Sequence, residues 1–117
     1  MSDELKAMLR DLRQEGARSS AVISRDGLVI ASDLDANTYV ETFAIMCATL
    51  MGAAVTANME LSRGAPEKVV VESSDGKMLI VSAGKKAVVV SVIGNGTDES
   101  AVQRRMKDIA AAVVSQG

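Results

Sequence analysis

The chain has 117 residues, of which 48 % are apolar, so it is long enough to form one domain with a substantial core. Its formal net charge of −2 argues against a nucleic-acid-binding surface, which needs a clear excess of positive charge. It has no histidine and a single cysteine, which excludes an internal disulfide, Ser–His and Cys–His nucleophile pairs, and a zinc site built on several cysteines.

The first elements expected along the chain are a helix and a β-hairpin. Asp3 is placed to cap a helix that ends near Gly16. Its apolar residues recur at spacings of three and four, and they are Leu5, Met8, Leu9 and Leu12. Strands are predicted for Ser20–Arg25 and Leu28–Ser32, because Asp26-Gly27 between them favours a tight turn.

A long helix follows, and it is the most informative part of the sequence. Residues that commonly precede a helix, namely Asp33, Asp35 and Asn37, lead into a predicted helix over Thr38–Ser62. From Thr42 to Met59 there is no charged residue. Gly64 and Pro66 end the helix.

This helix is apolar or small on almost every side, whereas a surface helix of a lone domain needs only one apolar stripe. One side is expected to face the chain's own sheet and the other a second copy of the chain. Ala44, Ala48 and Gly52, spaced by four, would let a partner backbone approach closely; the alternative is that they face the core. Threonines, a glycine and an asparagine interrupt the stretch, so no membrane insertion is expected.

Three more strands and a final helix complete the chain. The strands are predicted over Glu67–Glu72, Lys77–Ala83 and Ala87–Ile93, separated by Gly-containing turns. Thr97 is predicted to cap the last helix. The inward face of that helix is expected to hold Val102, Met106, Ile109, Ala110 and Val113.

The predicted order is α-β-β-α-β-β-β-α, and the short hairpins imply an antiparallel sheet. Met78–Val81 and Val88–Val90 are continuous apolar runs, so both faces of the sheet should be covered. The two amphipathic helices would cover one face and the long helix the other. We expect a single domain over residues 1–117.

Three motifs were weighed for chemistry, and none fits. Asp33–Asn37 resembles the start of a calcium loop, but Thr38 and Ala44 stand where Gly and Glu are required. Gly94-Asn95-Gly96 lacks the third glycine of a dinucleotide loop, so a turn is expected. The short basic clusters, Lys85-Lys86 and Arg104-Arg105-Lys107, are expected to be solvated. No cofactor or metal is expected.

The segment Gly16–Asp33, with the sequence GARSSAVISRDGLVIASD, closely resembles the hairpin of the roadblock family, which is named after a dynein light chain. The small-residue helix and the Ser74-Asp75-Gly76 turn match the family as well. The resemblance implies a profilin-like α+β sandwich. In it, a five-stranded antiparallel sheet carries the first and last helices on one face and the long helix on the other.

Members of this family dimerise through the long helix and the strand after it, so that two sheets join into one. Carried onto this chain, that surface comprises the predicted Thr38–Ser62 helix and residues 67–73. The residues expected in the dimer interface are Ala44, Cys47, Ala48, Met51, Gly52, Val55, Met59, Val69 and Val71.

Family members are platforms rather than catalysts, and prokaryotic ones resemble regulators of Ras-like small GTPases. The resemblance therefore implies a cytoplasmic, non-enzymatic homodimeric adaptor for such a GTPase. Its partner contacts are expected near the dimer seam, at Thr42, Thr49, Asn58 and Arg63. The alternatives are a structural light-chain or scaffold subunit that pairs with another roadblock-type chain, and a small-molecule sensor with a defined pocket.

Overall fold

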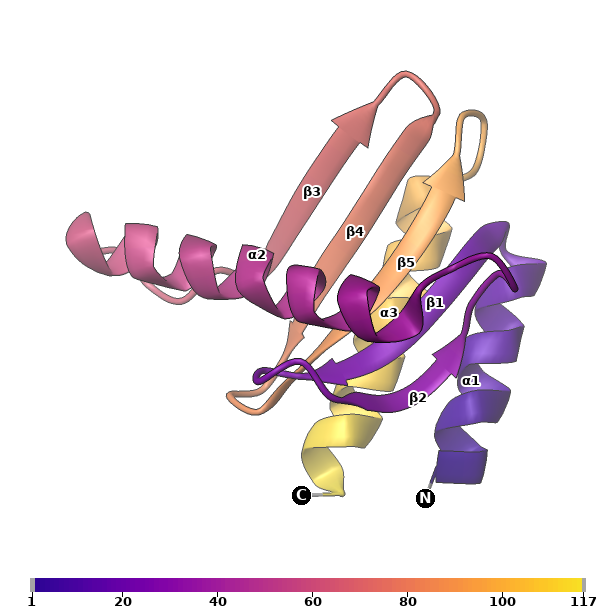
Figure 1. Ribbon diagram of the computed structural model, residues 1–117, viewed down its shortest axis with the longest axis horizontal. Helices are drawn as coiled ribbons and strands as arrows, with labels where there is room; N and C mark the ends of the chain where they lie inside the picture. Colours follow the sequence, from indigo (N-terminus) through magenta and orange to yellow (C-terminus); the bar gives the residue numbers. More distant parts are fainter. Residues whose placement is uncertain (1, 117) are drawn as a thin grey trace.

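The computed structural model describes residues 2–116, which form three helices and five strands in the predicted order (Figure 1). Their bounds are α1 Ser2–Gln14, β1 Ala17–Ser24, β2 Val29–Asp33, α2 Val40–Glu60, β3 Lys68–Ser73, β4 Gly76–Ala83, β5 Ala87–Gly94 and α3 Glu99–Ser115. Every predicted element is therefore confirmed, with ends displaced by only a few residues.

The five strands form one antiparallel sheet in the order β2-β1-β5-β4-β3. The last strand, β5, enters between β1 and β4, so the two hairpins flank it. The edges of the sheet are β2 and β3. The central strands β1, β4 and β5 are mostly buried, as their continuous apolar runs predicted, whereas every residue of β3 is at least partly exposed.

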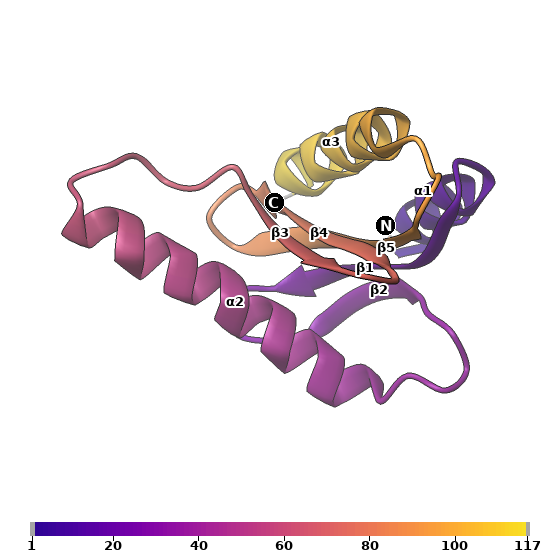
Figure 2. The ribbon, with the colours of Figure 1, turned by 90° about the horizontal axis from the view of Figure 1, so that it is seen from above.

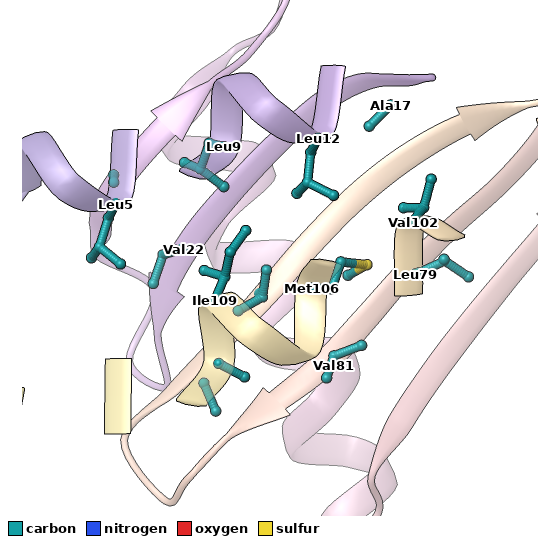
Figure 3. Packing of buried hydrophobic residues seen from close by; sticks show 14 of the residues in the cluster. Leu5, Leu9, Leu12, Ala17, Val22, Leu79, Val81, Val102, Met106 and Ile109 are labelled. Atoms are coloured by element: carbon teal, nitrogen blue, oxygen red, sulfur yellow. The ribbon is translucent and has the colours of Figure 1, made fainter. Parts of the chain in front are cut away.

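The helices lie on opposite faces of the sheet, with α1 and α3 on one side and α2 on the other (Figure 2). Between the sheet and the α1–α3 layer lies the larger of two apolar clusters, to which α1 contributes Leu5, Leu9 and Leu12 (Figure 3). From α3, Val102, Met106, Ile109 and Ala110 are buried and Val113 is half-buried, as predicted. Each large side chain buried here contributes roughly 1.5–3 kcal/mol relative to an exposed one.

Ion pairs tie the elements of this layer together at its surface. Arg13 at the end of α1 forms a two-pronged pair with Asp33 of β2, at 2.9 and 3.0 Å. Lys77 of β4 lies 2.7 Å from Glu99 of α3, which raises the pKa of the lysine and lowers that of the glutamate through the hydrogen bond and the opposite charge.

Three predicted helix caps are wrong. Asp3 lies in the first turn of α1 and not before it. Asp33 does not precede α2 as a capping residue, because it is the last residue of β2 and its carboxylate is held by Arg13. The residue before α2 is Tyr39, whose side chain makes no capping hydrogen bond. At α3 the cap is Asp98 rather than Thr97: its carboxylate accepts a hydrogen bond from the backbone N–H of Ala101 at 3.2 Å.

Replacement of Asp98 by alanine should lower the free energy of unfolding by about 1 kcal/mol, because the first turn of α3 loses its side-chain acceptor. Urea denaturation followed by circular dichroism measures this change. Thr97→Ala is the matched control, since it removes the neighbouring hydroxyl; a larger loss in this variant than in Asp98→Ala would contradict the assignment of the cap.

Candidate functional site: a protein–protein interface

The inner face of α2 packs on the sheet through the second apolar cluster. Ala44, Cys47 and Met51 of α2 meet apolar side chains of the three central strands in this cluster, and Ala48 beside them is buried as well. The residues that the sheet contributes are Ala21, Ile23, Ile80, Val88 and Val90.

Four residues predicted for the dimer interface therefore face the chain's own core: Ala44, Cys47, Ala48 and Met51. The core-facing alternative is correct for Ala44 and Ala48. Of the small-residue stripe, only Gly52 is exposed, and a Cβ built on it would meet no atom within 4 Å. Ala44 and Ala48 face the sheet because small side chains allow a helix to lie close to a sheet.

The outer face of α2 carries larger apolar side chains that the sequence analysis missed. Met46 is 51 % exposed and Ile45 49 %, and Leu50 is also exposed. Ala53, which is exposed too, lies two turns along from Met46 on the same side. Helical periodicity is the signal that could have found them. Once Ala44, Cys47, Ala48 and Met51 are known to face the sheet, Met46 and Ala53 must lie on the opposite side of the helix.

The C-terminal part of α2 extends beyond the edge of the sheet at β3 (Figures 1 and 2). Its last residue buried in the core is Met51. Beyond that point Val55 is half-buried, and Met59 and Leu61 are strongly exposed. After the helix, Asn58 Nδ2 donates a hydrogen bond to the Gly64 carbonyl at 2.9 Å, which holds the following loop against the end of α2.

The edge strand β3 is the second part of this surface. On its outer side it pairs with no other strand of residues 2–116. Val69 is half-buried against the α2 cluster, while Val70 and Val71 are each 39 % exposed. An exposed apolar edge is a ready template for pairing with another chain unless something protects it.

The sheet face under α2 is only partly covered by that helix. The register aligns Val69, Ile80 and Val90 in one cross-strand row beneath α2. The next row on the same face consists of Val71, Met78 and Val92, and all three are at least partly exposed. Figure 1 shows that β3, β4 and β5 continue past the helix at this end.

The four residues predicted to contact a partner do not form one cluster. Thr42 and Thr49 are exposed on α2, and the Thr49 hydroxyl donates to the carbonyl of Ile45 at 2.7 Å. Asn58 is half-buried, since its side chain closes the end of the helix, and Arg63 is exposed in the following loop.

Of the motifs considered for chemistry, Gly94-Asn95-Gly96 has a structural role. Asn95 Nδ2 donates to the Ser74 carbonyl, and the N–H of Thr97 to the carbonyl of Gly94, so Gly94-Asn95-Gly96 is a turn. Within residues 2–116, no three Asp, Glu, Cys or His side chains gather as a metal site would require.

By length and composition alone, α2 could cross a membrane. One such helix is weak evidence, because core helices of soluble proteins satisfy the same criterion. Here one side of the helix packs against the sheet, which a lipid-embedded helix would not do.

Comparison with known proteins connects this geometry to a family. The sequence model of the Roadblock/LC7 domain family matches residues 5–92 of this chain. The uncharacterized protein MJ0714 of Methanocaldococcus jannaschii is 35 % identical over 85 residues, which cover 73 % of this chain and 72 % of the relative.

Solved structures share the fold at lower identity. Myxococcus xanthus MglB has a TM-score of 0.89 at 16 % identity, covering 97 % of this chain and 94 % of its own. A Roadblock/LC7 domain from Streptomyces avermitilis has a TM-score of 0.87 at 19 % identity, covering 95 % of both chains. Acanthamoeba castellanii profilin II has a TM-score of 0.67 at 14 % identity, covering 97 % and 98 %. The expected profilin-like sandwich is thereby confirmed.

The position of Cys47 yields a test of which side of α2 faces inward. Burial raises the pKa of its thiol to about 11, so the thiolate that reacts with iodoacetamide is scarce at pH 8. We expect alkylation in the native protein to be on the order of 100-fold slower than in denaturant.

The matched comparison is a Cys47→Ala chain that also carries Ser100→Cys, which moves the thiol to an exposed position on α3, away from the outer side of α2. This thiol should react nearly as fast as an unfolded one. Fast native alkylation of Cys47 itself would show that the inner face has been assigned to the wrong row.

Proposed function

Because this chain belongs to the Roadblock/LC7 family, we propose that it is a non-catalytic, cytoplasmic adaptor that forms a homodimer and regulates a Ras-like small GTPase. The observation that carries the proposal is the set of exposed apolar side chains on the outer side of α2, together with the free edge of β3. Exposed apolar surface gathered in this way is typical of a protein interaction site.

A two-fold dimer would satisfy every unpartnered part of this surface at once. In such a dimer the same patch serves both copies. Pairing β3 with β3 of the partner would occupy the free edge and join the two sheets. The projecting end of each α2 would then extend over the other copy's sheet, toward the half-exposed row of Val71, Met78 and Val92.

The proposed interface therefore keeps part of the predicted set and replaces the rest. The residues kept are Gly52, Val55, Met59, Val69 and Val71, all of them at least partly exposed. The outer residues Met46, Leu50 and Ala53 replace the four that face the core. The uncharged stretch Thr42–Met59 of α2 supports close pairing of two identical helices, since like charges would otherwise meet across the axis.

The GTPase part of the proposal rests on the resemblance to prokaryotic roadblock regulators and on the shared fold with MglB. Thr42 and Thr49, exposed beside the proposed seam, remain the proposed contacts, with Asn58 and Arg63 at the far end of the helix. A protein of this kind that speeds hydrolysis would act by holding the GTPase's own catalytic groups in place.

Ala53→Glu tests the dimer. It introduces a charge on the exposed side of α2, which a lone domain tolerates and a close helix pair does not. We expect the wild type to sediment as a dimer and this variant as a folded monomer at micromolar concentration. Ser100→Glu, an exposed position on α3, is the control and should stay dimeric. A monomeric wild type, or a dimeric Ala53→Glu variant, would contradict the proposed interface.

Affinity capture tests whether the protein binds a small GTPase. The tagged protein is incubated with a lysate of its source organism that contains either GDP or a non-hydrolysable GTP analogue, and mass spectrometry identifies what is bound. We expect one small GTPase to be enriched in a single nucleotide state. Recovery of another roadblock-type chain irrespective of nucleotide, without a GTPase, would instead support a structural light-chain role.

A further inference from the structure

A groove of about 700 Å³ lies at the end of the sheet where β4 extends beyond the start of β3. We call it the Arg25 groove; Arg25, Val55, Pro66, Ser82, Lys85 and Lys107 are among its lining residues. It lies between the underside of α2, the loop after α2, the β4–β5 turn and the C-terminal half of α3. Its volume is in the range typical of small-molecule sites.

Hydrogen bonds hold the walls of this groove in place. Ser82 donates its hydroxyl to the Pro66 carbonyl at 2.8 Å, and its backbone N–H donates to the carbonyl of Glu67 at 2.9 Å. These bonds fasten the loop after α2 to the end of β4. Val55, Val81 and Ala110 add apolar surface from three different elements.

Arg25 is fixed at the junction of these elements. Its Nη2 donates to the carbonyl of Gly84 at 2.8 Å and to the Ser82 hydroxyl at 3.3 Å, and its backbone N–H donates to the carbonyl of Lys86 at 2.8 Å. Its Nε is buried and has no hydrogen-bond partner among the described residues. Arg25 itself lines the groove, so its guanidinium offers positive charge to an anionic ligand there.

The charge of the groove points to the same kind of ligand. Three cations, Arg25, Lys85 and Lys107, line it together with one acid, Glu67, although the chain as a whole is acidic. None of the three cations lies in an ion pair among residues 2–116, whereas Arg13, Lys77 and Arg105 do. Guanidinium and ammonium groups bind carboxylates and phosphates through charge-assisted hydrogen bonds.

From this combination of cations, unpaired among residues 2–116, and apolar walls, we propose that the Arg25 groove binds a small organic anion, a carboxylate or phosphate ester with a compact apolar body. The anionic group would lie against Arg25, Lys85 and Lys107, and the apolar body against Val55 and Pro66. Apart from Val55, which the proposed dimer interface also includes, the site lies outside the β3 edge and the outer side of α2, so it goes beyond the proposed adaptor role.

Titration of the ¹⁵N-labelled protein with phenyl phosphate and with benzoate, at constant ionic strength, tests the proposal. We expect at least one anion to cause saturable chemical-shift changes at the amides of Glu67, Ser82 and Gly84. Which of the two saturates identifies the anionic group, and inorganic phosphate shows whether the apolar body is needed. Benzyl alcohol, which is uncharged, should not saturate the site.

Two neighbouring lysines provide a matched pair of variants. Lys85 lines the groove, and Lys86 is equally exposed in the same turn but does not. Lys85→Gln should weaken binding of the anion about tenfold, whereas Lys86→Gln should leave it unchanged. Equal weakening in both variants, or shifts that stay linear with concentration for both anions, would overturn the proposal.

Discussion

The structure depends on a mismatch between a helix with two apolar sides and a sheet that can cover only one of them. The inner row of α2 lies against the sheet, with Ala44, Cys47, Ala48 and Met51 all buried. The larger side chains of the opposite row remain exposed, Met46 and Leu50 among them. Exposed apolar area of this extent is unfavourable in water, which is why we propose that a partner binds on that side.

The rest of the fold presents this uncovered surface on a rigid support. On the opposite face of the sheet, α1 and α3 bury a cluster of large aliphatic side chains and are fastened by ion pairs such as Lys77–Glu99. That layer is satisfied within the single chain. On the other face, the outer side of α2 exposes apolar side chains and β3 is a free edge, while the opposite edge strand, β2, also exposes Val29 and Ile30. Such a division suits a platform that assembles through one surface.

The Arg25 groove follows from the same layout at the other end of β3. The end of β4 extends beyond the point where β3 begins to pair with it. The loop after α2 therefore crosses the end of the sheet, where a hydrogen bond from Ser82 holds it. The loop leaves a recess between α2 and α3 that neither helix fills. Arg25 reaches this recess from the β1–β2 hairpin, across the base of the β4–β5 turn.

Hydrophobic periodicity and turn residues in the sequence were enough to determine the order of elements, the antiparallel sheet and the inward faces of α1 and α3. The uncharged stretch Thr42–Met59 also indicated that two sides of the long helix need covering. Which row of α2 faces the sheet was decided only by the tertiary structure, because both rows are apolar and periodicity cannot rank them; packing placed Ala44 and Cys47 inside. The hydrogen bonds of Asp33 with Arg13 and of Arg25 with Gly84 were also decided only by the tertiary structure, since each joins residues far apart in the chain.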